Sequence, residues 1–350
     1  MNNKKKTKVL ITSEIDSKHL KMLEEKCKII LRGRAVNSSS ILDERRMIEV
    51  ARENKDITIL IVGADQITSN VLDEFDSLKL IECTRGNPIN VDIKACTERG
   101  ILVTNTPGRN ANAVSEFTIA LMICCARKIP QAYLSIKNRD CTVEQSFDRK
   151  NKKDVVWLHP SLKEHPYVKF RGFELDEKVL GLVGLGAIGL NVAEKARSFH
   201  MRVIAYDPYV SDEVFKKNHI EKVELNYLLK NADFISLHAK VTKETVNLID
   251  KEELSMMKNT AYLINTARGA LINQKALYEA LLSKQIAGAA LDVFEDEPLT
   301  SQNPLINLDN LILTPHIGGA SSDVVRHHSK MAVKDIFSFL EGQPPINLVN

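Results

Sequence analysis

A glycine-rich segment near the middle of the chain constrains the fold more than any other part of it. An apolar run over residues 179–183 is followed by a G-x-G-x-x-G pattern at 184–189. The residues that come next have the apolar spacing of a helix, at Ile188, Val192, Ala196 and Phe199. A second apolar run, over 202–206, ends in Asp207. This order predicts a strand, a tight turn, a helix and another strand, which is the context that a dinucleotide-binding fingerprint requires. An ordinary strand-to-helix turn is the alternative interpretation.

Each glycine of this turn is required for a different physical reason. Gly184 permits the tight turn, Gly186 lets the backbone approach a pyrophosphate, and Gly189 allows the helix to pack close to the strand. The helix begins at Ala187 and Ile188, where free N–H groups and the positive end of the helix dipole favour phosphates.

Asp207 predicts which dinucleotide is bound. A carboxylate at the end of the second strand accepts hydrogen bonds from a ribose 2′-hydroxyl and repels a 2′-phosphate. The next residues, Pro208 and Tyr209, supply no arginine that would compensate for a phosphate there. The sequence therefore favours NAD over NADP as the cofactor.

Length and composition limit the class of protein. With 350 residues the chain is too long for one simple core, so we expect two domains. The net charge of +3 favours no nucleic-acid partner, and no apolar stretch approaches the ~20 residues of a membrane span. The N-terminus has no secretory pattern, and the cysteines form no C-x-x-C pair. We therefore expect a cytoplasmic protein with no membrane partner and no metal site.

Alternating strand and helix patterns predict an α/β fold with two doubly wound parallel sheets. The first set of expected strands covers 9–11, 29–31, 57–62, 80–83 and 102–104, with helices at 17–25, 45–52 and 113–127. The second set covers 179–183, 202–206, 234–237, 261–265, 287–292 and 311–314. A helical pattern over 322–340 has no sheet of its own left to join, so we expect it to return to the first domain.

These patterns predict a substrate domain in two pieces, residues 1–111 and 320–350, with a nucleotide-binding domain, residues 112–319, inserted between them. Residues 138–178 interrupt the alternation, because they are rich in lysine, aspartate, histidine and proline and include Trp157. Their length predicts a surface excursion that is either functional or mobile.

Three polar residues follow strands of the second set. Arg268, Glu297 and His316 come after its last three strands. Because the carboxyl ends of parallel strands form the ligand-binding edge of a doubly wound sheet, we expect these side chains at one edge. Each alone has a purely structural explanation, but the three together favour hydride transfer to a carbonyl. In such a reaction a histidine delivers the proton, a neighbouring carboxylate favours the imidazolium, and an arginine holds a substrate carboxylate.

Several segments resemble the D-isomer-specific 2-hydroxyacid dehydrogenase family, which includes 3-phosphoglycerate, glycerate/hydroxypyruvate and D-lactate dehydrogenases. They are residues 99–101, 105–110, 184–189, 236–238, 265–269, 291–298 and 314–319, together with Asp207. The resemblance is dense over 84–137 and 179–320 and weaker over the first 80 residues. It implies a Rossmann NAD-binding domain inserted in a flavodoxin-like substrate domain.

The resemblance also implies roles for residues at matching positions. His316 is the implied acid or base, Glu297 its partner and Arg268 the carboxylate anchor. Beyond the glycine loop with Ala187 and Ile188, the implied cofactor contacts are Asp207, Pro208, His238, Thr245, Thr266, Ala267, Asp292 and Gly319. Of these, Asp207 would bind the adenosine ribose and Asp292 the nicotinamide carboxamide.

The substrate loops depart from the family pattern. The usual G-x-G-x-D-N-x-D loop appears as residues 85–92, with Arg85 in place of the first glycine, which adds a cation and bulk. The loop at 61–65 lacks the arginine expected for a phosphorylated substrate, and Asp65 would repel a phosphate. Lys240 stands where a proline is usual after His238.

The candidate substrate contacts are Ala64, Arg85, Gly86 and Arg268. We hypothesise that Arg85, together with Arg109, reads a second anionic or hydroxyl-rich end of the substrate. An ion pair between Arg85 and a structural acid is an equally open alternative. We expect no appended regulatory domain after residue 340.

Two classes of function remain open. The first is an NAD-dependent D-2-hydroxyacid dehydrogenase that acts on a small-molecule 2-oxo or 2-hydroxy acid. The second is an NAD(H)-sensing corepressor or scaffold on the same fold. The set of Arg268, Glu297 and His316 favours the enzyme, because a sensor has no physical need for it. A formate-type dehydrogenase is disfavoured, since that branch has glutamine where Glu297 stands. Glu297 is preferred to Glu295 as the histidine's partner because the family's acid directly precedes a proline.

The resemblance further implies a homodimer. In this family the helix and loop that correspond to residues 113–178 form the two-fold contact. The apolar run at 119–126 fits such a contact, and burial against its own domain explains the run equally well.

Overall fold

The computed structural model describes residues 6–144, 162 and 164–350, and the chain divides into two compact units. The terminal unit consists of Met1–Asn110 with Ala320–Asn350, and the central unit of Ala111–Gly319. Trp157 and the rest of 145–161, in the excursion expected at 138–178, lie outside the described residues.

The terminal unit is built on a parallel sheet with the strand order β2-β1-β3-β4-β5. Its strands are β1 (Thr7–Ile11), β2 (Cys27–Leu31), β3 (Ile59–Val62), β4 (Leu80–Cys83) and β5 (Leu102–Thr104). β3 and β4 are buried along their whole length, as expected for parallel strands that are covered on both faces. Strand order reverses between β1 and β3, so the loops after these strands diverge at the carboxyl edge.

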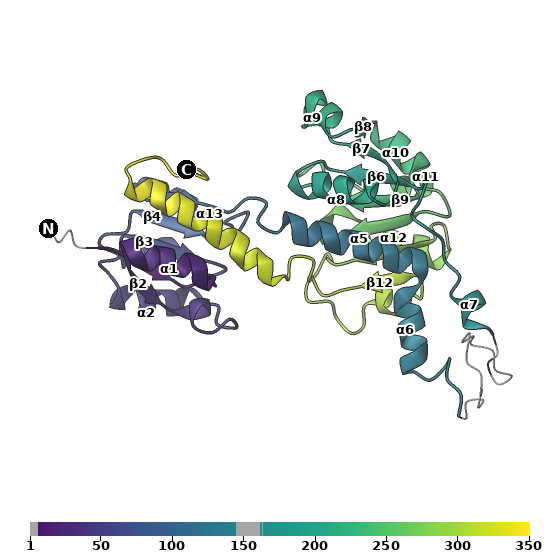
Figure 1. Ribbon diagram of the computed structural model, residues 1–350, viewed down its shortest axis with the longest axis horizontal. Helices are drawn as coiled ribbons and strands as arrows, with labels where there is room; N and C mark the ends of the chain where they lie inside the picture. Colours follow the sequence, from purple (N-terminus) through teal and green to yellow (C-terminus); the bar gives the residue numbers. More distant parts are fainter. Residues whose placement is uncertain (1–5, 145–161, 163) are drawn as a thin grey trace, which may run out of the picture. The chain divides into compact units, whose positions relative to one another are not determined.

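Helices cover both faces of this sheet. One face packs on α1 (Ser17–Lys26) and α13 (Ser322–Leu340). The other face packs on α2 (Glu44–Glu53), α3 (Ser69–Leu72) and α4 (Ile93–Glu98). α13 belongs to this unit although it comes last in the chain, and Figure 1 shows it beside α1. Its apolar residues Val333 and Ile336 complete the core on that face.

The central unit contains a longer parallel sheet with the order β12-β11-β10-β9-β6-β7-β8. Its strands are β6 (Val179–Val183), β7 (Arg202–Tyr206), β8 (Glu221–Lys222), β9 (Phe234–Leu237), β10 (Tyr262–Asn265), β11 (Gly288–Leu291) and β12 (Leu311–Leu313). The chain runs outward from β6 to β8 and then returns to β9 on the other side of β6. The carboxyl ends of β6 and β9 therefore flank the switch point at which doubly wound sheets bind ligands.

Helices also cover both faces of the central sheet. α5 (Ala111–Arg127) and α8 (Ala187–Arg197) pack together on one face, as Figure 1 shows. α10 (Leu225–Asn231), α11 (Lys251–Met256) and α12 (Gln274–Leu282) cover the other. The remaining helical segments are α6 (Ile129–Lys137), α7 (Pro166–Lys169), α9 (Asp212–Lys217), η1 (Gly33–Ala35), η2 (Gly269–Leu271) and η3 (Pro304–Asn307).

The predicted α/β fold class is confirmed, and two details of the prediction are wrong. Phe199 was expected on the apolar face of the helix after the glycine loop, but α8 ends at Arg197 and Phe199 is 41% exposed. The chain turns there through His200, which has a φ of 56°. β8 was missed because Glu221 and Lys222 are both exposed at the sheet edge and carry no apolar signal.

No single helix of the described residues has both the length and the apolar composition of a membrane span. α5 and α6 reach that length and composition only when taken together, and they are bent by 69°.

Candidate active site

The glycine loop after β6 has the local geometry that the sequence pattern requires. Gly184 has a φ of 96°, and a Cβ there would lie 2.6 Å from the backbone nitrogen of Ala239. A Cβ at Gly189 would lie 2.4 Å from the Gly184 carbonyl oxygen, so this glycine lets α8 pack against the loop. A Cβ at Gly186, in contrast, would meet no atom within 4 Å. Packing within the chain therefore explains Gly184 and Gly189, whereas Gly186 keeps the backbone open at the N-terminus of α8.

This N-terminus fits a dinucleotide phosphate. Gly186 is the N-cap residue of α8, and it has no side chain with which to cap the first N–H groups. Ala187 is exposed and Ile188 half-buried in the first turn. Uncapped N–H groups and the helix dipole favour an anion at this place.

Asp207 lies at the end of β7, beside the glycine loop. Its Oδ2 accepts a hydrogen bond from Leu185 N (2.8 Å), and its Oδ1 accepts one from Tyr209 N (2.9 Å). These bonds fix a half-buried carboxylate at the loop, and each oxygen keeps a lone pair for a further donor. Pro208, the next residue, is exposed.

His238 follows β9 on the other side of the switch point. Its Nε2 is hydrogen-bonded to Ser236 Oγ (2.9 Å), and burial lowers its pKa to about 4, so the imidazole is neutral near pH 7. Within the described residues its Nδ1 is buried and has no hydrogen-bond partner. A Cβ on Gly184 would lie 2.7 Å from the His238 carbonyl carbon, which places His238 against the glycine loop. A buried nitrogen without a partner is costly, and a hydrogen bond from a bound ligand would relieve the cost.

The turn after β10 presents Arg268. Asn265 braces the turn, because its Nδ2 donates to the Arg268 carbonyl oxygen (2.8 Å) and its Oδ1 accepts from Ala267 N (3.0 Å). Thr266 is buried, with its hydroxyl 2.9 Å from that of Thr118 on α5. Arg268 itself is exposed, and its Nη1 donates to the Ala267 carbonyl oxygen (2.6 Å).

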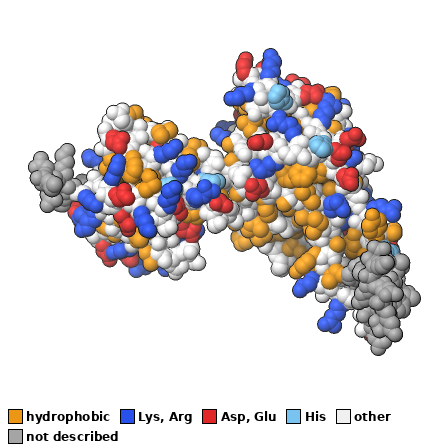
Figure 2. Space-filling view, viewed as in Figure 1, with side chains coloured by type: hydrophobic (Ala, Val, Ile, Leu, Met, Phe, Trp, Pro, Cys, Tyr) orange, Lys and Arg blue, Asp and Glu red, His pale blue; other side chains and the backbone are white. Residues whose placement is uncertain are grey.

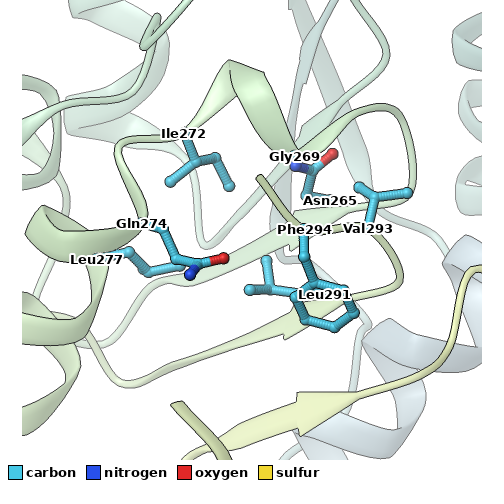
Figure 3. Close-up of a pocket in the computed structure, with 8 residues that line it drawn as sticks. All are labelled: Asn265, Gly269, Ile272, Gln274, Leu277, Leu291, Val293 and Phe294. Carbon is cyan, nitrogen blue, oxygen red and sulfur yellow. The ribbon is translucent and has the colours of Figure 1, made fainter. Parts of the chain in front are cut away.

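The turn that carries Arg268 is packed directly on the loop after β11. A Cβ at Gly269 would lie 1.9 Å from the carbonyl carbon of Phe294, so only glycine fits there. Figure 3 shows Asn265 and Gly269 together with Val293 and Phe294 around a small, mostly apolar pocket. Close packing of these two loops fixes their relative position.

Asp292, at the end of β11, organises the loop that follows β12. It is 1% exposed, and its carboxylate accepts hydrogen bonds from Thr314 Oγ1 (2.7 Å), Ile317 N (2.8 Å) and Gly318 N (2.7 Å). Its carbonyl oxygen accepts a further bond from His316 N (2.8 Å). His316 has a φ of 54°, an uncommon backbone conformation for a non-glycine residue, which this set of bonds holds in place.

His316 and Glu297 form a hydrogen-bonded pair. His316 Nδ1 lies 2.7 Å from Glu297 Oε2, and Glu297 Oε1 accepts a bond from Phe294 N (3.1 Å). Both side chains keep solvent access. Glu295, two residues earlier, instead accepts a bond from Gln274 N (3.0 Å) at the start of α12. The acid beside the histidine is therefore Glu297 and not Glu295.

The remaining predicted cofactor contacts lie on loops of the central unit. Ala267 and Gly319 are half-buried, after β10 and β12 respectively. Thr245 Oγ1 donates to the Lys240 carbonyl oxygen (2.6 Å) and accepts from Thr242 N (2.7 Å), so it closes its own loop.

The predicted substrate residues Ala64, Arg85 and Gly86 belong to the terminal unit, on the loops after β3 and β4. Asp65, which was expected to repel a phosphate, also has a structural role. Asp65 is 0% exposed, and its carboxylate accepts bonds from Leu42 N (2.9 Å) and Thr12 Oγ1 (2.7 Å), so it holds neighbouring loops together.

Sequence reasoning missed several supporting residues. Thr118 and Thr314 act through hydrogen bonds to residues that are distant in the sequence, for which there is no local signal. Asn265 braces its own turn. His328 on α13 did leave a signal, because a histidine four residues after Val324 lies on the helix face that carries the apolar positions.

Known proteins resemble this chain over most of its length. Residues 119–318 match the family model described as "D-isomer specific 2-hydroxyacid dehydrogenase, NAD binding domain". The chain is 36% identical, over 98% of its length, to the D-3-phosphoglycerate dehydrogenase of Methanocaldococcus jannaschii, of which it spans 59%. It is 35% identical, over 99% of its length, to the glyoxylate reductase of Korarchaeum cryptofilum, of which it spans 96%.

A solved structure is similar over the whole chain. The crystal structure of the TT0316 protein from Thermus thermophilus has a TM-score of 0.78 and 33% sequence identity, and the alignment covers 98% of this chain and 100% of that one. The chain thus belongs to the D-isomer specific 2-hydroxyacid dehydrogenase family. The family match confirms the nicotinamide cofactor and the class of NAD-dependent D-2-hydroxyacid dehydrogenase predicted from the sequence.

Proposed function

We propose that this chain interconverts a small 2-oxo acid and the D-2-hydroxy acid, with His316 as the acid or base, Glu297 as its partner and Arg268 as the carboxylate anchor. The observation that carries the proposal is the 2.7 Å contact between His316 and Glu297 at the ligand-binding edge of an NAD-binding sheet. A sensor or scaffold on this fold has no chemical use for such a pair.

The roles follow from the atoms that remain available. NADH, when bound, supplies the hydride that reduces the C2 carbonyl carbon. His316 supplies the proton to the carbonyl oxygen, and because its Nδ1–H is bonded to Glu297, the proton is carried on Nε2. The Glu297 carboxylate accepts the Nδ1 proton and so fixes the orientation of the ring. In the oxidation, Nε2 accepts the hydroxyl proton.

Arg268 is suited to bind the substrate's C1 carboxylate. It is exposed, and one nitrogen of its guanidinium bonds the Ala267 carbonyl oxygen, which leaves the remaining donors for a ligand. An arginine offers a planar pair of donors that matches a carboxylate. Ala64, Arg85 and Gly86, on loops of the terminal unit, are further proposed substrate contacts.

For the cofactor we propose NAD rather than NADP. The Asp207 carboxylate is fixed beside the phosphate-binding loop and would accept the ribose 2′-hydroxyl, whereas a 2′-phosphate would meet its negative charge. The other proposed contacts of the cofactor are Pro208, Thr245, Thr266, Ala267 and Gly319. His238 would direct its unpartnered Nδ1 to the ligand, and Asp292 would contribute to the nicotinamide end while it holds the His316 loop.

We further propose a homodimer formed through α5 and α6, in the cytoplasm. Figure 2 shows hydrophobic side chains gathered on the face of the central unit that α5 crosses, and α6 exposes Ile129, Tyr133, Leu134 and Ile136. Burial of such side chains in an interface is favourable. All six cysteines are free thiols, which fits a reducing compartment. A monomeric mass in solution would reject the dimer.

The test of the main proposal is NADH consumption with glyoxylate, hydroxypyruvate, pyruvate and longer 2-oxo acids. We expect turnover with at least one of them, and we expect the D-hydroxy acid as the product. Tight NADH binding without turnover of any of these acids would instead favour the sensor or scaffold function.

A further inference from the structure

The carboxyl edge of the terminal sheet gathers arginines. Arg34 follows β2, Arg85 follows β4 and Arg109 follows β5, so the three come from different loops of one edge. The last two loops are tied together, because Thr106 N donates to the Arg85 carbonyl oxygen (2.9 Å) and Asn105 Nδ2 donates to the Gly86 carbonyl oxygen (2.9 Å). In a doubly wound parallel sheet this edge is where ligands bind.

Carboxylates at this edge do not balance the arginines. Arg34 pairs with Glu14 (3.2 Å), while Asp65 is buried and hydrogen-bonded elsewhere. Over the part of the chain that the structure describes, neither Arg85 nor Arg109 forms an ion pair with a carboxylate. The alternative considered for Arg85, a structural ion pair, therefore has no support in these residues.

A neutral histidine positions Arg109 instead. Arg109 Nη1 donates to His328 Nδ1 (3.1 Å), and His328 Nε2 donates to the Glu14 carbonyl oxygen (2.8 Å). His328 is 4% exposed, and burial, reinforced by the neighbouring Arg109, lowers its pKa to about 4. A carboxylate in this place would orient Arg109 and also cancel its charge, whereas a neutral imidazole orients the guanidinium and leaves the charge intact.

The arginines also affect one another. Burial lowers the pKa of Arg109, and repulsion from Arg85 and Arg34 lowers it further. Arginine remains charged under all ordinary conditions, so this repulsion persists in the free protein. Glu14 offsets only the charge of Arg34, and the remaining repulsion is unfavourable for folding. An anion bound between Arg85 and Arg109 would remove it.

We propose that Arg85 and Arg109 form a subsite for a second anionic group of the substrate, a carboxylate or a phosphate, distinct from the carboxylate bound by Arg268. The substrate is then a 2-oxo acid with an anion at its far end. This inference rests on the proposed dehydrogenase function. Arg85 stands where the family pattern has a glycine. We therefore attribute the preference for a second anionic group to this chain and not to the family as a whole.

The test compares substrates that differ only in the terminal group. The first pair is 2-oxoglutarate and 2-oxopentanoate, and the second is phosphonooxypyruvate and hydroxypyruvate. We expect the wild type to prefer the charged member of at least one pair, and the pair that shows the preference identifies carboxylate or phosphate as the group. In Arg85→Gln and Arg109→Gln the preference should fall roughly 10- to 100-fold, mainly through KM, because a charge-assisted contact is lost.

Arg45→Gln is the matched control, because Arg45 is an exposed arginine of α2 in the same unit. It should keep the wild-type preference. A wild type with no preference for the charged member of either pair, or variants that keep it, would overturn the proposal.

A binding measurement separates this proposal from the proposed reaction. At constant ionic strength, phosphate or succinate should raise the Tm of the wild type and of Arg45→Gln, but not the Tm of Arg85→Gln or Arg109→Gln. If no 2-oxo acid is reduced but this pattern holds, the dehydrogenase function fails and the anion subsite stands. If the Tm of the wild type does not respond to either anion, the subsite fails.

Discussion

The carboxyl edges of the two sheets treat charge in opposite ways. At the edge of the central sheet three carboxylates have partners: Asp292 holds the loop of His316, Glu297 holds the imidazole, and Asp207 holds the glycine loop. At the edge of the terminal sheet, Arg85 and Arg109 have no carboxylate partner within the described residues. The first edge uses its charges to fix its own geometry, and the second keeps its charges available for a ligand.

This difference follows the two tasks that we propose for the edges. Proton transfer requires an imidazole at a fixed position, which backbone and side-chain hydrogen bonds provide. Recognition of an anion requires charge that the protein has not already neutralised. The charged groups of the first edge have hydrogen-bond partners, which favours stability. Arg85 and Arg109 at the second edge have no carboxylate partner within the described residues, as expected where a binding function outweighs stability.

The largest effect is expected for His316→Gln. Removal of the proton donor should lower kcat by about 10²–10⁴-fold, because general acid–base catalysis contributes that much. NADH affinity should change little, and fluorescence titration measures it separately from turnover. Glu295→Gln is the matched control, because Glu295 lies on the same loop but bonds Gln274 N instead of the histidine. An unchanged kcat in His316→Gln would show that His316 is not the acid or base of the reaction.

The second effect concerns Asp292, the acid that holds the loop of His316. Asp292→Ala leaves Thr314 Oγ1, Ile317 N and Gly318 N without their acceptor. The free energy of unfolding should fall by about 3 kcal/mol, as for other buried charged acceptors, and urea denaturation measures this change. Asp309→Ala, at an exposed position of the same unit, is the control. Equal stability of the two variants would show that Asp292 does not organise the loop.

The parts of this site that the sequence predicts are those set by local backbone rules. Gly184 is read correctly because the turn itself requires its φ of 96°, and Gly189 because a Cβ there would meet the nearby Gly184 carbonyl oxygen. The ligand edge is predicted because His316, Glu297 and Arg268 directly follow strands, and strand direction alone brings them to one side of a sheet.

The parts that the sequence does not predict depend on which distant group a polar side chain meets. Asp65 reads as a free acid next to a substrate loop, yet it is buried against Leu42 N and Thr12. His328 reads as one polar residue on a tail helix, yet it orients Arg109, more than 200 positions earlier in the chain. Pattern and spacing do not contain such pairings, because they arise only when the whole sheet is assembled.

The third effect tests the carboxylate at the end of β7. Asp207→Ala should raise the KM for NADH about 10-fold, through the loss of a charge-assisted hydrogen bond to the ribose. The KM for NADPH should change much less, because the mutation also removes the repulsion of the 2′-phosphate. Asp212→Ala, which removes an exposed acid that pairs with Lys222, is the control. Equal changes for both cofactors would reject the assignment of Asp207 to the ribose.

The smallest effect is expected for Glu82, a second buried acid. Its replacement should raise the free energy of unfolding, whereas replacement of Asp292 should lower it. Glu82 on β4 is 0% exposed; Thr104 Oγ1 donates to its Oε2, and within the described residues its Oε1 has no partner. Burial raises its pKa well above the ordinary 4.5, so the folded state binds more protons than the unfolded state, and stability falls as the pH rises above 4.5. Glu82→Gln should therefore stabilise the protein near pH 7, and the gain should vanish near pH 4, where the carboxyl is protonated in both states. Urea denaturation across this range measures the difference, with Glu98→Gln at an exposed position as the control. A loss of stability at pH 7 would mean that Glu82, like Asp292, is held by more partners than its one hydrogen bond.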